Sequence, residues 1–148
     1  MVRSGLTLRP VAASAIRHHG RETYPHECCG ALIGLGGLVT AALALPNTTD
    51  DGPRRRFLVR PNDYQAAERH AAELDAGLLG FYHSHPDAPA RPSRYDLEHA
   101  WPVFSYVIIG VDGGDPGQMT SWRLRNDRSA FDQEQLIEAD PDDEDAGV

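Results

Sequence analysis

The chain contains no lysine, only two cysteines and no long apolar run. A membrane-spanning helix needs about 20 consecutive apolar residues, and residues 1–10 lack the charged start and apolar stretch of a signal peptide. Cys28 and Cys29 are neighbours, so a strained bridge between them is not expected, and their thiols fit a reducing compartment. These features predict a cytoplasmic protein.

Basic residues are scarce, with 14 arginines against 22 acidic residues and a net charge of −8. A nucleic-acid-binding surface needs a basic face that displaces counterions, so this composition disfavours a general nucleic-acid binder. The lack of lysine has two explanations. It fits codon bias or an acid-rich, salt-adapted proteome, and it would also suit a protein that handles lysine-linked conjugates without becoming one.

A length of 148 residues suits one domain with its own core. Residues 1–137 are assigned to it, and the acidic residues 138–148 are predicted to form a disordered tail. Apolar spacing predicts helices over 8–24, 62–75 (capped by Asn62), 93–101 and 131–137, and strands over 29–35, 38–45, 56–60, 78–83, 104–111 and 119–124. The expected fold class is α/β of the α+β type, a mixed sheet of about five or six strands flanked by two larger helices.

Two histidines stand at the end of a predicted strand. Residues i and i+2 of a strand point to the same side, so His83 and His85 can bind one cation. Pro86 stops the strand, and a proline-rich loop returns the chain to Ser93 and Asp96. Ser-x-x-Asp alone is typical of a capping box, but beside the histidines it adds an oxygen ligand and a hydroxyl. His83, His85 and Asp96 are therefore predicted to bind zinc and to leave its fourth position open for water.

Such a site also needs a carboxylate that accepts the proton of the attacking water. Glu27 is the candidate, because it begins a predicted strand and sheet packing could aim it at the metal. Glu22 and Glu68 are weaker candidates, since predicted helices carry them. Cys28 and Cys29 are expected to be buried small hydrophobic side chains; a nucleophile or a metal thiolate is the alternative.

The motif His-x-His-Pro, followed after six residues by Ser-x-x-Asp, resembles the metal motif of the JAMM (MPN+, JAB1/Mov34) metalloprotease family. Every position of that motif is filled here, with the family's spacing. Glu27-Cys-Cys-Gly also resembles a Glu-x-Cys-Gly element of the small prokaryotic members. The resemblance covers roughly residues 8–124 and implies a single MPN/JAB-like domain.

Carried onto this chain, the resemblance implies one Zn²⁺ per chain and a role for each residue of the motif. The zinc ligands would be His83, His85 and Asp96. Glu27 would hydrogen-bond the water at the fourth position and act as general base and then as general acid, and Ser93 would stabilise the tetrahedral oxyanion. Ser84, between the histidines, would only support the geometry.

Members of that family cut amide bonds next to the C-terminal Gly-Gly of ubiquitin-like proteins. This chain has little room for large insertions and looks more like small prokaryotic peptidases that act on sulfur carriers. The resemblance implies a zinc metallopeptidase, a monomer or homodimer whose partner is a ubiquitin-like or sulfur-carrier protein. Two alternatives are a RadC-like protein associated with DNA repair, which the acidic charge disfavours, and a non-catalytic MPN scaffold.

Overall fold

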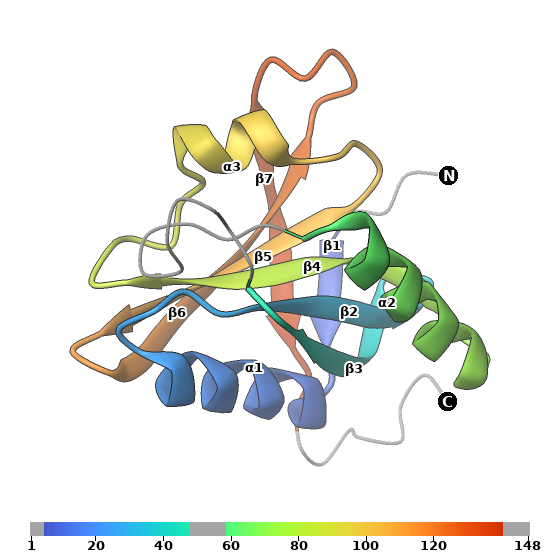
Figure 1. Cartoon of the computed structure of the whole chain (residues 1–148), viewed down its shortest axis with the longest axis horizontal. Coiled ribbons are helices and arrows are strands. Elements are labelled where there is room, and N and C mark those ends of the chain that lie inside the picture. Colours follow the sequence, from blue (N-terminus) through green and yellow to red (C-terminus); the bar gives the residue numbers. More distant parts are fainter. Residues whose placement is uncertain (1–4, 48–58, 141–148) are drawn as a thin grey trace.

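The structure, a computed structural model, describes residues 5–47 and 59–140. Its elements are β1 (Gly5–Leu8), α1 (Pro10–Thr23), β2 (Cys29–Leu35), β3 (Leu38–Leu45), α2 (Pro61–Glu73), β4 (Gly77–Pro86), α3 (Arg94–His99), β5 (Ser105–Asp112), β6 (Asp115–Leu124) and β7 (Phe131–Glu138). The strands join in the order β1-β3-β2-β4-β5-β6-β7, and β1 pairs with β7 to close a barrel (Figure 1). Among these residues, no helix is both long and apolar enough to cross a membrane.

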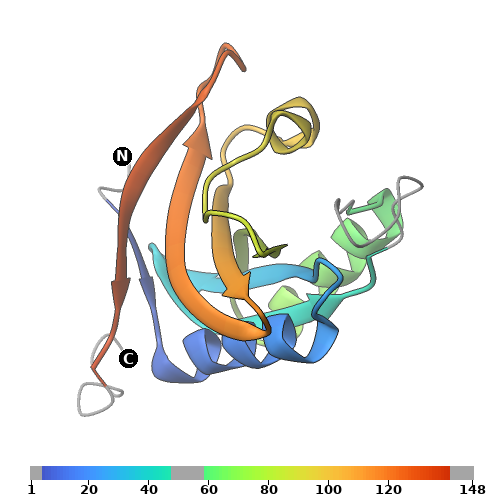
Figure 2. The ribbon, with the colours of Figure 1, turned by 90° about the vertical axis from the view of Figure 1, so that its left-hand side faces the viewer.

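Alternation along the central strands gives the sheet two apolar faces. On one face, Ile16 of α1 belongs to the same buried apolar cluster as Leu32 and Ile109. On the other face, Phe81 and Tyr106 belong to a second cluster, which includes Ala67 of α2 and Ala100 after α3. Figures 1 and 2 both place α1 and α3 on opposite sides of β2 and β4. Because His83 and His85 are two and four residues from Phe81, they lie on the α3 side.

The predicted hairpin is confirmed with the same bounds, as β2 and β3. Gly36 and Gly37 form its turn at φ values of +60° and +85°, a backbone region that glycine enters without steric cost. The strands around residues 78–83, 104–111 and 119–124 are also confirmed, each within a few residues of its predicted ends. The mixed α/β fold class is therefore correct.

Two elements at the edges of the chain differ from the prediction. Residues 131–137, predicted as a helix, form strand β7, which pairs with β6 and β1. The glutamates and glutamines there favour a helix, but strand pairing overrides that weak preference. The helix predicted from residue 8 begins at Pro10, because residues 5–8 form β1, with Leu6 and Leu8 buried between β3 and β7.

Three smaller expectations differ from the structure or extend beyond the described residues. Asn62 does not cap α2: the helix begins at Pro61, and Arg60 is its N-cap residue. The strand predicted over 56–60 lies mostly outside the described residues, and Val59 and Arg60 are not in a strand. Glu138, the first residue of the predicted tail, ends β7, and residues 141–148 are not described, so the domain division stays a prediction.

Two glycines in β4 allow a test of how closely the strands pack. A Cβ added at Gly80 would lie 1.9 Å from the carbonyl oxygen of Ser105 in β5, whereas one at Gly77 would be 3.8 Å from its nearest contact. Gly80→Ala should therefore lower the free energy of unfolding by about 1–3 kcal/mol, because backbone must move to relieve the clash. Gly77→Ala should change it by less than about 1 kcal/mol. Urea denaturation measures both, and equal effects would contradict the proposed clash.

Candidate metal centre

Three side-chain atoms from two separate elements meet at one point on the α3 face of the sheet. The Nε2 atoms of His83 and His85 are 3.1 Å apart, and each lies 3.2 Å from Oδ2 of Asp96. All three residues are buried, with exposures of 1%, 8% and 5%. Two imidazole nitrogens and a carboxylate oxygen this close together are stable only with protons or a cation between them.

The spacing of these atoms fits a tetrahedral metal. Ligand atoms at about 2.0–2.1 Å from one zinc ion at tetrahedral angles are about 3.3 Å from one another. The three observed separations of 3.1, 3.2 and 3.2 Å match that value closely. Two imidazoles and one carboxylate are also a donor set typical of catalytic zinc, which leaves one position for water or substrate. The cluster is thus suited to a metal ion.

Two of the three candidate ligands, His85 and Asp96, are held by a further contact outside the cluster. Nδ1 of His85 lies 2.8 Å from the carbonyl oxygen of Pro89, to which it donates, so in the neutral ring Nε2 carries the lone pair that faces the cluster. Asp96 accepts from the backbone N–H of Ser93 at 2.8 Å, while Ser93 Oγ accepts from the N–H of Asp96 at 3.1 Å. The capping box and the ligand geometry therefore exist together, in the same four residues.

Burial and mutual contact shift the pKa values of the cluster. Burial lowers the pKa of His83, which favours the neutral imidazole that binds metal. For His85, burial acts in the same direction, but the contact with Asp96 outweighs it and raises the pKa. Burial would raise the pKa of Asp96, yet the two histidines and the Ser93 N–H together hold it well below its usual range. Asp96 is therefore a carboxylate at neutral pH.

Glu27 reaches the same point from just before β2, which begins two residues later at Cys29. The antiparallel register pairs Cys29 with His83, and continuing it sets Glu27 opposite His85. One ligand atom each from Glu27, His83 and His85 all lie within 4.8 Å of one another, and Glu27 is only 7% exposed. The strand register thus brings together residues that are 56 or more positions apart in the sequence.

Two polar contacts that the sequence did not suggest fix the backbone around Glu27. The N–H of Cys28 donates to Oγ of the fully buried Ser84 at 2.8 Å, so Ser84 joins the two strands that carry the cluster. Asn47, just after β3, donates its amide to the carbonyl oxygen of Glu27 at 3.0 Å. No motif marked Asn47, because its contact is with the backbone and forms only when the hairpin folds.

A cleft of about 360 Å³ opens beside the cluster, and its lining residues are Glu27, His85, Pro86, Ala88, Pro89, Arg91 and Ser93. The proline-rich loop thus forms one wall and the predicted base forms part of another. Because Ser93 Oγ accepts the Asp96 N–H, its own proton can be donated to an atom bound in this cleft. The cleft therefore offers a proton acceptor and a hydrogen-bond donor next to the candidate metal ligands.

Known proteins resemble this chain over most of its length. Residues 10–125 match a family described as prokaryotic homologs of the JAB domain. A desampylase from Haloferax volcanii is 34% identical over 120 residues, which cover 76% of this chain and 86% of that protein. The CysO-cysteine peptidase of Mycobacterium tuberculosis is 26% identical over 120 residues (80% and 82%). A probable TtuB-protein conjugate cleaving protease from Thermus thermophilus is 38% identical over 98 residues (66% and 64%).

Solved structures show the same fold. The solution structure of a protein from Desulfitobacterium hafniense has a TM-score of 0.79 and 30% identity, covering 91% of this chain and 93% of that one. The crystal structure of a JAB1/MPN domain protein from Archaeoglobus fulgidus has a TM-score of 0.62 at 17% identity, covering 93% and 100%. The barrel with its helices is therefore an arrangement that these proteins share.

The remaining candidates of the sequence lie elsewhere. Glu22 and Glu68 sit on exposed helix positions and are not part of the cluster. Cys28 and Cys29 are 2% and 0% exposed and pack in the apolar clusters on opposite faces of the sheet. Burial raises the pKa of both thiols, that of Cys29 to about 12. They therefore have the buried, hydrophobic character that the sequence suggested, and not that of nucleophiles.

The thiols should accordingly be protected in the folded protein. With a pKa of about 12, only about one Cys29 thiol in ten thousand is ionised at pH 8. Ellman's reagent at pH 8 should detect fewer than one thiol per native chain over an hour, and two at once after unfolding in guanidinium. Rapid reaction of a thiol in the native protein would contradict its burial.

Proposed function

Because the chain belongs to the family of prokaryotic JAB-domain homologs, we propose that it is a zinc-dependent peptidase or isopeptidase. It hydrolyses the amide bond next to the C-terminal Gly-Gly of a ubiquitin-like or sulfur-carrier protein. The observation that carries this proposal is the meeting of His83, His85 and Asp96 at tetrahedral spacing with Glu27 beside them. This arrangement has the ligands and the base that metal-assisted amide hydrolysis requires.

The substrate class is supported by the relatives. They are named a desampylase, a CysO-cysteine peptidase and a probable TtuB-protein conjugate cleaving protease. The last two names each give the bond partners: CysO with cysteine in one, and TtuB with a protein in the other. Each name describes an enzyme that cleaves the joined species. A terminal diglycine suits the cleft at the cluster, because residues without a side chain can approach its walls closely.

Each residue of the cluster has a separate task. His83, His85 and Asp96 would hold one Zn²⁺ per chain, and the bound ion would supply Lewis-acid activation of the scissile carbonyl and of water. Glu27 accepts the proton of the attacking water and then passes it to the leaving amine. Ser93 donates its hydroxyl proton to the oxyanion that develops on the carbonyl. Ser84 positions Glu27 through the Cys28 N–H.

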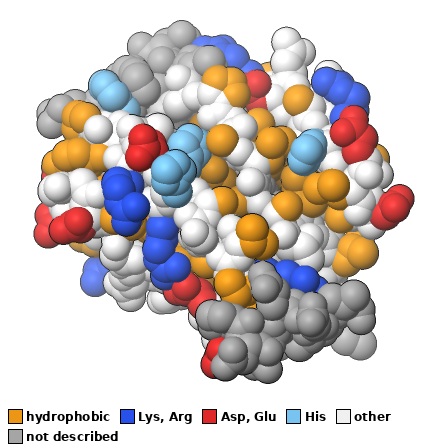
Figure 3. Space-filling view, turned by 90° about the horizontal axis from the view of Figure 1, so that it is seen from below, with side chains coloured by type: hydrophobic (Ala, Val, Ile, Leu, Met, Phe, Trp, Pro, Cys, Tyr) orange, Lys and Arg blue, Asp and Glu red, His pale blue; other side chains and the backbone are white. Residues whose placement is uncertain are grey.

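The two alternatives make different demands. A RadC-like role with DNA would need a basic surface, and on the face that carries α1, basic side chains are interspersed with acidic, histidine and apolar ones (Figure 3). A non-catalytic scaffold has no need for a base placed beside a complete ligand set. We further propose that the protein works in the cytoplasm, a compartment that suits its free cysteines, as a monomer or homodimer.

Replacing the proposed base should stop cleavage without releasing the metal. Glu27→Gln should lower kcat by about 10²–10⁴-fold, since the amide cannot accept the proton, while zinc content stays at one per chain. The substrate is a sulfur-carrier protein whose Gly-Gly is extended by a short peptide, and mass spectrometry follows release. Glu22→Gln, at an exposed position five residues earlier, is the control and should match the wild type. Equal cleavage by all three proteins, or none by the wild type with zinc, would contradict the proposal.

Zinc binding should depend on the charge of Asp96. At a free zinc concentration 100 times the Kd, the folded state gains about 2.7 kcal/mol, which raises the unfolding temperature. Asp96→Asn keeps an oxygen that can accept the Ser93 N–H of the capping box but removes the carboxylate, so this variant should lose both the bound zinc and the thermal shift. Glu98→Gln, on the exposed side of the same helix, should keep both. Metal analysis and thermal unfolding decide, and unchanged zinc content in Asp96→Asn would exclude Asp96 as a ligand.

A further inference from the structure

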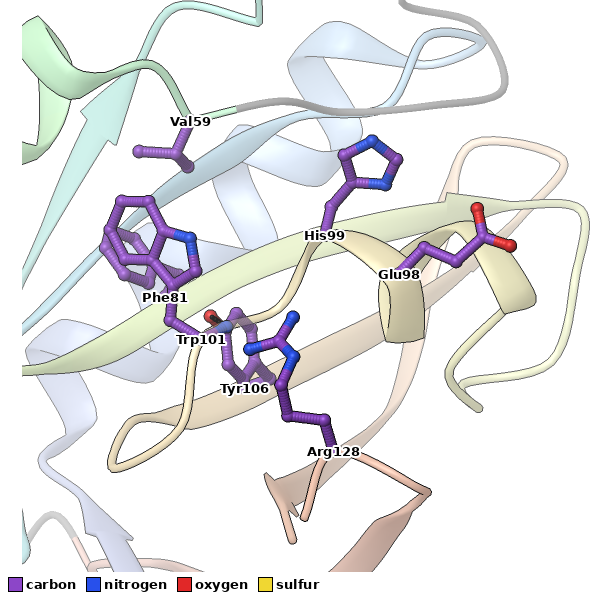
Figure 4. A pocket seen from close by; sticks show the side chains of 7 residues that line it. All are labelled: Val59, Phe81, Glu98, His99, Trp101, Tyr106 and Arg128. Atoms are coloured by element: carbon purple, nitrogen blue, oxygen red, sulfur yellow. Dashed lines mark hydrogen bonds between the residues drawn. The ribbon is translucent and has the colours of Figure 1, made fainter. Parts of the chain in front are cut away.

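A second hollow, of about 240 Å³, lies on the α3 side of the sheet. Figure 4 shows Phe81 and Tyr106 on the strands, with Trp101 close to Phe81 and Val59 across from them. Arg128 extends from the β6–β7 connection toward Tyr106. None of the residues that line the cleft at the metal centre lines this pocket. It is therefore a separate site that the proposed catalytic residues do not use.

The pocket is preformed and mostly apolar. The Tyr106 hydroxyl accepts a hydrogen bond from the backbone N–H of Trp101 at 2.7 Å, and Arg128 donates to the carbonyl oxygen of Ala100 at 2.9 Å. The loop after α3 is therefore held at two points. Phe81 and Trp101 rings meet edge to face with centroids 6.2 Å apart. Its volume is below the roughly 300–1,000 Å³ of pockets for whole small molecules. The size and lining suit one apolar side chain of a peptide.

Its position relative to the metal centre follows from β4. Phe81, His83 and His85 occupy every second position of this strand, so their side chains share one face. The metal centre between the two histidines is therefore level with residue 84. Phe81 is three residues before that level, or about 10 Å along the strand. Helix α3 spans the same interval, since Asp96 lies in its first turn at the cluster and His99 lines the pocket.

We propose that this pocket is a substrate subsite that binds an apolar side chain of the carrier's extended tail. The inference rests on the proposed function. An extended peptide advances about 3.3 Å per residue, so the residue at the pocket stands three positions before the glycine at the cleaved bond. The pocket therefore binds the second residue before the Gly-Gly pair. Trp, Tyr and Arg, three of its lining residues, are also the types that contribute most in protein interfaces.

The first test compares two peptides of the same composition on the zinc-loaded protein. Acetyl-Leu-Ala-Gly-Gly-aminomethylcoumarin places leucine at the pocket, and acetyl-Ala-Leu-Gly-Gly-aminomethylcoumarin places it one residue nearer the metal. We expect kcat/KM to be about tenfold or more higher for the first, the usual size of discrimination by an apolar pocket. Trp101→Ala should reduce the ratio to within about threefold, since one wall is lost. Val103→Ala, on the same loop but outside the pocket, should keep it.

The second test does not require catalysis. The peptide acids acetyl-Leu-Ala-Gly-Gly and acetyl-Ala-Leu-Gly-Gly are titrated into the wild-type protein while NMR follows the two indole N–H signals, which Trp101→Ala assigns. The first peptide should shift the Trp101 signal and the second should not. The Trp122 indole, which donates to Thr120 Oγ1 at 2.8 Å, is the internal reference and should stay unchanged.

The two tests separate the subsite from the proposed function. A selective Trp101 shift without cleavage of any substrate would support the subsite and contradict the peptidase. Cleavage of both peptides at equal rates would support the peptidase and overturn the subsite. Equal shifts of Trp101 by both peptides, or none by either, would also overturn the subsite.

Discussion

The antiparallel pairing of β2 with β4 is the constraint on which the candidate site depends. Its register sets Cys29 against His83, and this one alignment determines which residue faces His85 across the strands. A shift by one residue would turn every side chain of β2 to the other face. Glu27 would then leave the cluster, and the apolar clusters on both faces would be disrupted. The β2–β4 register therefore determines both the packing of the core and the placement of the proposed base.

Asp96 joins local folding to the chemistry of the cluster in a different way. As the N3 residue of α3 it completes a capping box with Ser93, and the same carboxylate oxygen faces both histidines. The helix start thus orients the carboxylate that is proposed as a metal ligand. This arrangement explains why serine and aspartate must be three residues apart, since other spacings could not satisfy the cap. The loop after Pro86 then has only to bring that helix start to the end of β4.

The histidine pair, the capping box and the apolar strands were predictable from sequence because each depends on local spacing. Glu27 was harder, since nothing near it in the chain reports the β2–β4 register that brings it to His85. Strand β7 was predicted wrongly because its glutamates and glutamines favour a helix. Its actual state depends on distant partners: Glu134 accepts hydrogen bonds from Ser105 and Ser121 on β5 and β6. Barrel closure is a long-range property that local preference does not encode.

Helix α3 connects the candidate metal centre to the aromatic pocket, since Asp96 is in its first turn and His99, its last residue, lines the pocket. Only six residues long, it carries Asp96 near its start and ends beside the loop that Arg128 and Tyr106 fasten. A short helix moves as one body, so displacement of its end by a badly fitting tail would also displace the Asp96 carboxylate. Recognition of the tail and correct ligand geometry would then favour the same position of α3. An apolar residue of the substrate would then contribute to catalysis at a distance, by holding α3 in the position that keeps the Asp96 carboxylate beside the two histidines.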